Sequence, residues 1–418
     1  MKILRLAPYV TISGIRQFSR NLTGFGRSVW DISRYMADKG EEVHLFTYVC
    51  TNGLALDGVT FISHRITDCI TSARLTDLPK ATQIAVSGLQ QEPLRQFKSA
   101  RYVLLRGYVE RIIEKEHPDI VHVHGLDTSL LVAAQRANRP FITTLHGLYS
   151  LEPGISHEAQ EVEGKLVENI NEAGIHISVI SGSVKDTILD RWSISFPDNI
   201  HVIPHGVDSS RFRSAASKEE LRRKYDIPQE AMVILNVASL IPLKNQMAIL
   251  AALEHLLPNE HILCILVGQG PDRSRLMQFI NEHELDRFAQ LVGHAEGQTL
   301  VDYYRLADVF VFPSIAEGFG RPMLEAMAAG LPVVTYEDLG AAKDLFNPSC
   351  MSLVKGRNPE ELAHVIRDAL CRQWDYASIE EWGARFTWDK VVDQYVELYD
   401  LAKSDFRLTD RVALGEGL

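Results

Sequence analysis

The segment Glu317-Gly-Phe-Gly-Arg-Pro-Met-Leu-Glu325 lies between two short apolar runs, Asp308-Val-Phe-Val-Phe-Pro313 and Leu331-Pro-Val-Val-Thr335. Runs of this length and composition are typical of buried strands. Between them, Pro322 suits the first turn of a helix, where its missing N–H would have no partner, and Gly330 suits the position just past the end. We therefore predict a strand, a glycine turn and a helix that ends near residue 329.

Two carboxylates flank this turn. Free backbone N–H groups and the positive end of a helix dipole meet there, so an anion such as a nucleotide diphosphate can bind. Glu317 and Glu325 are poor ligands for phosphate but good acceptors for hydroxyls of a sugar and a ribose. The alternative makes Glu317 a helix cap and Glu325 a solvated side chain. Apolar neighbours weigh against a solvated Glu325, namely Met323, Leu324, Ala326, Met327 and Ala328.

The composition is that of a soluble globular protein, with 418 residues of which 46% are apolar and 23% charged. This length predicts two or three domains. No basic start precedes an apolar run and a cleavage site, and no apolar run reaches about 18 residues, so we expect a cytoplasmic protein. The five cysteines lack metal-ligand spacing and suit free thiols: Cys50, Cys69, Cys264, Cys350 and Cys371.

The formal net charge of −11 argues against nucleic acid as a partner, because such binding needs a clustered positive field. One basic stripe stands out. We interpret it as the solvated face of a helix, with contact to an anionic acceptor or to the inner face of the membrane as the alternative. Its members are Arg95, Lys98, Arg101, Arg106 and Arg111.

Alternating strands and helices run through the first half of the chain. A strand at 2–6, the pair Gly24-Phe-Gly26 at the start of an amphipathic helix, and a strand at 42–47 predict a βαβ unit. Further strands are predicted at 120–124, 141–145 and 176–180. This alternation predicts a mostly parallel, doubly wound sheet within a Rossmann-like domain over residues 1–203.

The pattern then begins again. We predict strands at 232–237, 262–267, 288–292, 309–312 and 332–335, and hence a second Rossmann-like domain over 208–384, after a linker at 203–208. A last helix from Trp388 to about residue 402 would cross back onto the first domain with the rest of 385–418, and residues 408–418 are predicted to be a loose tail. The fold class is α/β, with two doubly wound domains facing across a cleft at the carboxyl ends of their strands.

Four segments in order give the chain a resemblance to a known family: Ile203-Pro-His-Gly-Val-Asp208, Val267-Gly-Gln-Gly-Pro271, Ala307-Asp-Val-Phe-Val-Phe-Pro-Ser314 and 317–325. With them the chain resembles the retaining glycosyltransferases of the GT-B fold, in particular family 4 (glycosyl transferases group 1). The resemblance covers nearly the whole chain and is strongest from 203 to 335. It implies an acceptor-binding first domain and a second domain that binds a nucleotide sugar.

The resemblance also implies roles for individual residues. Glu317 would hold the donor sugar, Glu325 the ribose, and Lys244 the phosphates, while His146 would be the active-site histidine of the first domain. Gly24 and Gly26 would let the first helix approach the donor phosphate or the acceptor. The remaining donor-binding residues would be Gly318, Phe319, Gly320, Arg321, Leu324, Ser239 and Gly268.

The chain departs from the family's pattern at two of these positions. Many relatives carry arginine where this chain has Ser239, so Lys244 and backbone amides suffice or another base such as Arg321 replaces it. Phe25 also separates two glycines that are adjacent in many relatives. We interpret His122 and His124 as satisfied structural residues, because a histidine in an apolar strand usually is one. Two weaker cleft candidates are Asp127 and Ser181.

The expected reaction moves a hexose-type sugar from a nucleotide diphosphate to a hydroxyl of a glycan, glycolipid or small molecule. No protein nucleophile is evident, so the resemblance implies same-face substitution in which the leaving phosphate takes the acceptor's proton. We expect a UDP- or GDP-linked donor rather than an ADP-linked one. The sequence has no Asp-rich motif or His/Cys cluster, so we expect neither an essential metal nor a cofactor.

Three other functions share part of this pattern. A nucleotide-sugar 2-epimerase on the same fold and a non-catalytic sugar-nucleotide binding protein both stay open. A dehydrogenase is disfavoured, because Gly24-Phe-Gly26 lacks a third glycine and lies well past the first strand.

Overall fold

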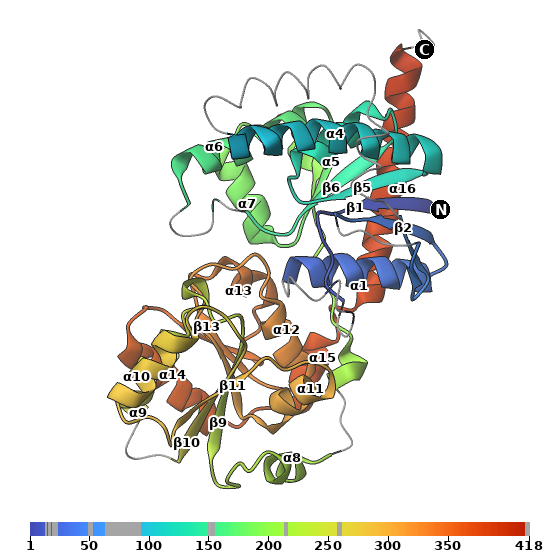
Figure 1. Cartoon of the computed structure of the whole chain (residues 1–418). Helices are drawn as coiled ribbons and strands as arrows, with labels where there is room; N and C mark the ends of the chain where they lie inside the picture. Colours follow the sequence, from blue (N-terminus) through green and yellow to red (C-terminus); the bar gives the residue numbers. More distant parts are fainter. Residues whose placement is uncertain are drawn as a thin grey trace.

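The computed structural model describes residues 1–12, 15, 18, 24–48, 53–62, 93–148, 150, 155–212, 216–256 and 261–413, without the side chains of 93–103 and 407–413. It contains two α/β units, each built around one sheet (Figure 1). The predicted fold class, α/β with two parallel sheets, is confirmed. Cys50 and Cys69 lie outside the described residues, as do the side chains of Arg95, Lys98 and Arg101.

The first sheet has the strand order β3-β4-β2-β1-β5-β6-β7-β8 and is parallel except where β3 pairs with β4. Its strands are β1 (Lys2–Leu6), β2 (Glu42–Phe46), β3 (Ala55–Leu56), β4 (Val59–Phe61), β5 (Ile120–His124), β6 (Phe141–Leu145), β7 (His176–Val179) and β8 (Ile200–Val202). Its helices are α1 (Gly24–Asp38), α4 (Pro93–Glu116), α5 (Thr128–Arg136), α6 (His157–Glu172) and α7 (Gly182–Arg191), with a 3-10 turn η3 (Pro197–Asn199).

The second sheet has the order β11-β10-β9-β12-β13-β14, with every described pair parallel. Its strands are β9 (Met232–Val237), β10 (Ile262–Val267), β11 (Ala289–Gly293), β12 (Val309–Phe312), β13 (Val333–Tyr336) and β14 (Met351–Val354). Its helices are α8 (Lys218–Lys224), α9 (Gln246–Leu256), α10 (Arg273–Glu282), α11 (Gly297–Leu306), α12 (Arg321–Ala328), α13 (Gly340–Leu345), α14 (Pro359–Cys371) and α15 (Tyr376–Gly383), with 3-10 turns η4 (Ser209–Phe212) and η5 (Pro242–Lys244).

Four strands of the structure were not predicted from the sequence: β3, β4, β8 and β14. Each has two to four residues, so none is long enough for a clear alternation of apolar and polar side chains. β3 and β4 pair as a hairpin whose turn places Asp57 and Gly58 at positive φ. The ten predicted strands are present, with ends that differ by at most one residue.

The last helix, α16 (Trp388–Ala413), lies beside α1 and β6 of the first unit (Figure 1). Trp388, Val391, Tyr395 and Tyr399 are buried in the same apolar cluster as Ile3. The prediction that this helix ends near residue 402 was wrong, because it continues to Ala413, so residues 408–413 are not a loose tail. Between Trp388 and Gly415 the sequence has no glycine or proline, so nothing local stops the helix earlier.

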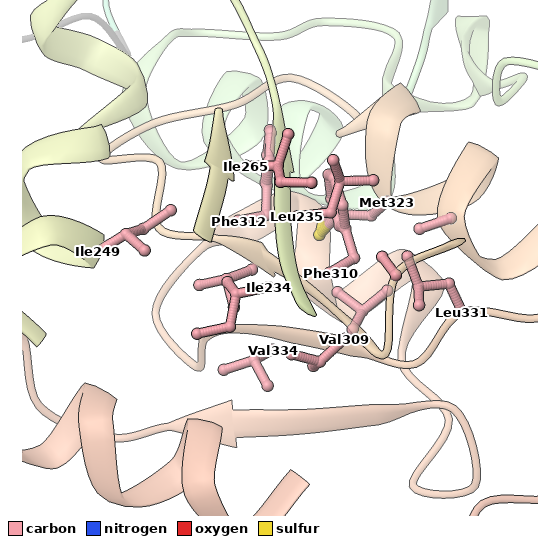
Figure 2. Packing of buried hydrophobic residues seen from close by; sticks show 14 of the residues in the cluster. Ile234, Leu235, Ile249, Ile265, Val309, Phe310, Phe312, Met323, Leu331 and Val334 are labelled. Atoms are coloured by element: carbon pink, nitrogen blue, oxygen red, sulfur yellow. The ribbon is translucent and has the colours of Figure 1, made fainter. Parts of the chain in front are cut away.

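Each sheet is covered on both faces by helices, which explains its continuous apolar strands. In the second unit, side chains of β9 and β12 such as Ile234 and Phe310 meet Met323 of α12 in one buried cluster (Figure 2). In the first unit, α1 and α16 cover one face, and α4 to α7 cover the other. The tight packing of α12 against this core fixes where the loop before it can lie.

The two units also contact each other directly. Helix α7 of the first lies against α13 of the second, where the backbone N–H of Gly182 donates to Asp344 Oδ1 at 2.7 Å. A Cβ added to Gly340 would lie 1.9 Å from Ser183 Oγ, so a larger residue there would displace the Ser183 side chain. Val207, in the segment between the sheets, forms an isolated bridge with Thr387.

Candidate functional site

The predicted strand, glycine turn and helix are present as β12, residues 313–320 and α12. Gly320 precedes the helix with φ of 75°, and a Cβ there would lie 2.2 Å from Met323 Cε. Pro322 occupies the first turn, as its sequence position indicated. Phe319 and Leu324 are buried, so these two residues anchor the turn in the core of the second unit.

Gly318 brings this turn against the first unit. A Cβ at Gly318 would lie 3.2 Å from the carbonyl oxygen of His146 and 3.0 Å from Ile180 Cδ1. His146 follows β6 and Ile180 follows β7, so the turn meets the carboxyl ends of the first sheet's strands. The space between the units is therefore narrow at this point, and a side chain in place of glycine would widen it.

Glu317 and Lys244, predicted to hold the donor sugar and the phosphates, form an ion pair with each other. Lys244 ends the 3-10 turn η5, and its ammonium group also lies 5.8 Å from the ring centre of Phe312. Both side chains are about one-fifth exposed. The ammonium can therefore orient the carboxylate, and both groups remain accessible to a ligand that enters between the units.

Glu325 is buried, and each of its carboxylate oxygens has one partner. It accepts hydrogen bonds from the Tyr304 hydroxyl at 3.0 Å and from Arg321 Nε at 3.2 Å. Burial, and next the negative charge of Glu325, raise the pKa of Tyr304 well above its usual value, so Tyr304 remains a donor. Arg321 Nη2 lies 2.7 Å from Asp31 Oδ2 on α1. Arg321 is thus held by two carboxylates, one from each unit.

A cavity of about 430 Å³ opens beside these residues. Its walls come from both units, since Gly24 and Arg27 begin α1 while the rest belong to the second unit. The lining residues are Gly24, Arg27, Val237, Ala238, Ser239, Val267, Gly268, Gln269, Gly270, His294, Ala295, Leu300, Arg321, Pro322 and Glu325. Five predicted site residues therefore share one cavity: Gly24, Ser239, Gly268, Arg321 and Glu325.

The remaining predicted residues do not line this cavity. Gly318 and His146 lie where the two units meet, and Glu317, the partner of Lys244, directly precedes Gly318. Gly26 is buried, and a Cβ there would lie 2.4 Å from Thr11 Oγ1, so it allows α1 to pack on the chain after β1. Gly24 has no atom within 4 Å of such a Cβ. The two glycines therefore differ, one serving packing and the other lining the cavity.

Glycines also allow the loops after β9 and β10 to form one wall. Gly268 has φ of 154°, and a Cβ there would lie 1.9 Å from the carbonyl oxygen of Ala238. At Gly270 the corresponding atom would lie 2.2 Å from the carbonyl oxygen of Leu240. This close contact brings backbone groups to the cavity surface beside Ser239, where a ligand can meet them without intervening side chains.

Arg27 and His294 also lie in the cavity wall, although neither was predicted from the sequence. Arg27 is partly exposed and has no hydrogen bond or ion pair with another residue that the structure describes. Burial raises the pKa of Tyr304, and the positive charge of Arg27 offsets part of that rise. The available signal was its position, one residue after Gly24-Phe-Gly26 in the first turn of a helix. A cation there opposes the helix dipole, so it is costly unless an anion binds nearby.

His146 belongs to a group of four histidines. Its Nε2 lies 2.9 Å from His124 Nδ1, and its Nδ1 lies 3.3 Å from His205 Nε2. Phe25 meets the ring edge-on at 4.9 Å. Burial, and next the charge of Arg5, lower the pKa of His146 to about 3, so the imidazole is neutral at physiological pH. Burial likewise lowers the pKa of His124 and His205 well below the usual value.

His122 stacks on His124 at 4.2 Å and uses both ring nitrogens within the first unit. Its Nδ1 lies 2.6 Å from the Tyr399 hydroxyl of α16, and its Nε2 lies 2.6 Å from Thr144 Oγ1. His124, by contrast, connects to His146 and is part of the site's support. The sequence interpretation treated the two histidines alike, and the structure separates them.

The two weaker cleft candidates are helix caps. Asp127 accepts from the backbone N–H groups of Ser129 and Leu130 at the start of α5. Ser181 accepts from Val184 N–H at 3.1 Å at the start of α7. Each side chain thus satisfies groups that a helix end leaves free.

The structure also bears on the metal ligands, membrane-spanning helices, cysteines and basic stripe considered from the sequence. Within the described residues, no group of three or more His, Cys, Asp or Glu side chains could hold a metal ion. None of the described helices is both long and apolar enough to span a membrane. Cys264 and Cys350 are buried free thiols, and Cys371 is an exposed one. In the basic stripe, Arg106 lies 3.5 Å from Glu110 one turn along α4.

Comparison with known proteins matches both parts of the chain. Residues 217–385 match the family described as glycosyl transferases group 1, and residues 22–211 match glycosyltransferase family 4. A relative named D-inositol 3-phosphate glycosyltransferase 2, from Catenulispora acidiphila, is 26% identical over 92% of this chain and 91% of its own length.

Solved structures show the same fold. Sucrose-phosphate synthase from Thermosynechococcus elongatus has a TM-score of 0.72 at 20% identity, covering 97% of this chain and 100% of its own. The Anabaena protein HepE, solved in complex with UDP-glucose, has a TM-score of 0.68 at 18% identity, covering 95% of this chain and 99% of its own.

Proposed function

The chain belongs to the group 1 glycosyltransferases of the GT-B fold, and we propose that it moves a hexose-type sugar from a nucleotide diphosphate to a hydroxyl acceptor with retention. One observation carries the proposal. The cavity of about 430 Å³ joins the start of α1 to the loops after β9 and β10 and to Glu325, and the turn that begins with Glu317, the partner of Lys244, leads directly into the helix that carries Glu325.

The cavity has the chemistry that a nucleotide diphosphate needs. Backbone groups near Gly268 and the N-terminal ends of α1 and α12 provide N–H donors for phosphate oxygens. Arg27 and Arg321 add positive charge from opposite units. A carboxylate accepts up to about four hydrogen bonds, so Glu325 can keep Tyr304 and Arg321 and still accept from ribose hydroxyls.

The Glu317–Lys244 pair suits the reacting end of the donor. A diphosphate carries more charge than one carboxylate, so it competes for the Lys244 ammonium. Glu317 is then free to accept hydrogen bonds from the donor sugar, which would lie beside the turn at Gly318. Donor binding would thus replace one ion pair by two contacts, one between Lys244 and the diphosphate and one between Glu317 and the sugar.

The proposed reaction has one bond exchange. The bond from the anomeric carbon to the β-phosphate oxygen breaks, the acceptor oxygen bonds to that carbon on the same face, and the acceptor's proton passes to the phosphate. Lys244 and Arg27 would stabilise the growing negative charge on the leaving phosphate, so the proposal requires no metal. Neutral His146 would contribute its carbonyl oxygen, which faces the turn at Gly318.

The donor class is inferred from the fold and the relatives. HepE was solved with UDP-glucose, and we propose UDP- or GDP-linked sugars rather than ADP-linked ones as donors. The relative from Catenulispora acidiphila is named for D-inositol 3-phosphate, so phosphorylated polyols join glycans and glycolipids as acceptor classes to be tested.

The decisive experiment incubates the protein with UDP- and GDP-hexoses, with and without such acceptors, and follows free nucleotide, donor and product. Acceptor-dependent release of nucleotide with a retained anomeric centre is expected. An epimerised donor without an acceptor would establish the epimerase instead, and binding without conversion would establish a binding protein.

Glu317→Gln tests the site within that experiment. It should lower the turnover by about 10²–10³-fold while nucleotide binding persists, because only contacts to the sugar are lost. The matched control is Glu381→Gln, an exposed glutamate of α15. Wild-type turnover in Glu317→Gln would remove Glu317 from the site.

A further inference from the structure

Arg5 is a buried cation at the centre of the first unit. It lies on β1 with none of its surface exposed. Within the described part of the chain, no carboxylate forms an ion pair with it. Instead, its Nη1 donates to Met36 Sδ at 3.0 Å, while Nε and Nη2 lie 3.1 and 2.6 Å from His124 Nε2. A buried guanidinium without a counterion is costly, so it needs a reason beyond stability.

The geometry fixes the direction of the hydrogen bonds that follow. A guanidinium only donates, so His124 Nε2 must accept and its proton lies on Nδ1. His124 Nδ1 then donates to His146 Nε2 at 2.9 Å, which places the His146 proton on Nδ1. His146 Nδ1 in turn donates to His205 Nε2 at 3.3 Å.

The chain of donors ends at the start of α1. His205 Nδ1 lies 3.5 Å from Ser28 Oγ, whose hydroxyl donates to the Gly24 carbonyl oxygen at 2.8 Å. Gly24 lines the cavity. Every donor between Arg5 and Ser28 therefore points from the interior of the first unit toward the cavity, and the positive ends of these groups add to that of the helix.

We propose that Arg5 is a positioning residue of the active site, which fixes His146 as the tautomer protonated on Nδ1 and aligns the donors of His124, His146 and His205 toward the start of α1. The effect on sugar transfer rests on the function proposed above, whereas the tautomer does not. Because one arginine sets three imidazoles, changing it reverses or randomises hydrogen bonds up to the edge of the cavity.

The charged and titratable groups that act on Arg5 and on these histidines come from both units. Arg5, His122, His124 and His205 face His146 within the first unit, Tyr395 and Tyr399 face Arg5 from α16, and Arg321 acts on His205 from α12. No carboxylate appears among these groups, so the positive charge of Arg5 opposes protonation of His122, His124 and His146.

The test is the tautomer of His146 in the full chain, measured by long-range ¹H–¹⁵N correlation spectra of ¹⁵N-histidine-labelled protein at pH 7. Wild type should show Nδ1–H for His124, His146 and His205. In Arg5→Met, which keeps an unbranched side chain of similar length but donates nothing, His146 should shift toward Nε2–H. Arg5→Lys keeps the charge with a single contact and should give an intermediate result.

Two kinetic measurements accompany the spectra. Arg5→Met should lower kcat at least 10-fold with less than a threefold change in donor KM, and the acid limb of its pH profile should move toward neutral pH. A merely structural role for Arg5 would alter the melting temperature without moving that limb. Arg139→Met is the control, because Arg139 contacts His117 at 3.1 Å on the surface of the same unit.

Two outcomes would overturn the proposal: an Nε2–H tautomer of His146 in wild type, or an Arg5→Met variant whose spectra and acid limb match wild type. If wild type transfers no sugar at all, the proposed function fails, and the spectra alone still decide whether Arg5 sets the tautomer.

Discussion

Arg321 of α12 joins Asp31 of α1, with Nη2 and Oδ2 separated by 2.7 Å, and so ties the donor-side helix to the other unit. Both side chains are nearly buried, and the guanidinium also lies 5.6 Å from the ring centre of Trp388. The same arginine holds Glu325. Glu325, which is proposed to bind ribose, and Asp31 of the other unit therefore pair with the same guanidinium. Donor binding at Glu325 is thereby linked to the distance between the two units.

Asp31→Asn should loosen this link. Removing one partner of a buried ion pair costs roughly 3 kcal/mol, since the remaining charge is left with fewer partners. Glu325 still pairs with Arg321, so the variant should fold, with a lower midpoint in urea and a raised donor KM. Small-angle scattering with and without UDP should reveal a larger ligand-free radius of gyration than in wild type. An unchanged radius of gyration and an unchanged donor KM would mean that the ion pair does not help to hold the two units together.

Gly318→Ala tests the contact between the turn and His146. The added Cβ would lie 3.2 Å from a carbonyl oxygen, which cannot move as a flexible side chain can. We expect little loss of stability in the second unit but a lower kcat, because the units cannot approach fully. Binding of UDP, measured by calorimetry, should stay within about threefold of wild type. A variant with normal kcat would show that this approach is not needed for turnover.

Lys244→Met should lower turnover by about 10²–10³-fold, the usual effect of removing one group that stabilises a leaving anion. It should also weaken nucleotide binding, in contrast to Glu317→Gln. Lys355→Met, at an exposed position of the second unit, is the matched control. A donor with a much better leaving group needs less stabilisation of the leaving anion by Lys244. If Lys244→Met lowers kcat equally with such a donor and with a nucleotide diphosphate sugar, the assignment is contradicted.

Arg27→Met tests whether Arg27 replaces the arginine that many relatives carry at the position of Ser239. If Arg27 supplies the second cation from the first unit, its loss removes one charge-assisted hydrogen bond worth about 1.5–3 kcal/mol, and the donor KM should rise roughly 10- to 100-fold. Ser239→Arg should then restore part of the affinity in the Arg27→Met background. The control is Arg275→Met on the exposed face of α10. If Arg27→Met has a donor KM near that of wild type and Ser239→Arg restores no affinity, Arg27 does not replace an arginine at position 239.

The sequence predicted the site best where the chemistry is local. The segment from Glu317 to Glu325 carries its glycine turn, proline and helix start within nine consecutive residues, so its backbone follows from neighbouring residues alone. Arg5 could not be recognised in this way. It occupies an apolar strand, where a single charge carries no pattern, and its partner His124 is more than a hundred positions away.

The same limit applies to contacts between the units. Nothing in the α1 sequence indicates that Asp31 meets Arg321, because the pairing depends on how two sheets face each other across a linker. The role of His205 was also not predicted. Its position in a turn-rich segment indicated only a linker, yet its ring lies in the histidine group beside His146.

The histidine group makes acid sensitivity a property of the fold. Burial, with the charge of Arg5, lowers the pKa of His146 to about 3, and burial also lowers those of His122, His124 and His205 well below 6.5. In the unfolded chain each takes up a proton as pH falls through about 6.5, but in the folded chain it does not. Stability is therefore full above this pH and falls below it, by up to about 1.4 kcal/mol per pH unit for each histidine.

This decline is expected between about pH 6 and 4 and can be measured by urea unfolding at fixed salt, followed by circular dichroism. Replacing His122 by Gln removes one such group while keeping donors and acceptors for Tyr399 and Thr144. Its slope of stability against pH should be shallower than that of wild type in this range. An identical slope would place the acid sensitivity in other groups, and an unfolding free energy constant down to pH 4 would contradict the neutral state of all four buried histidines.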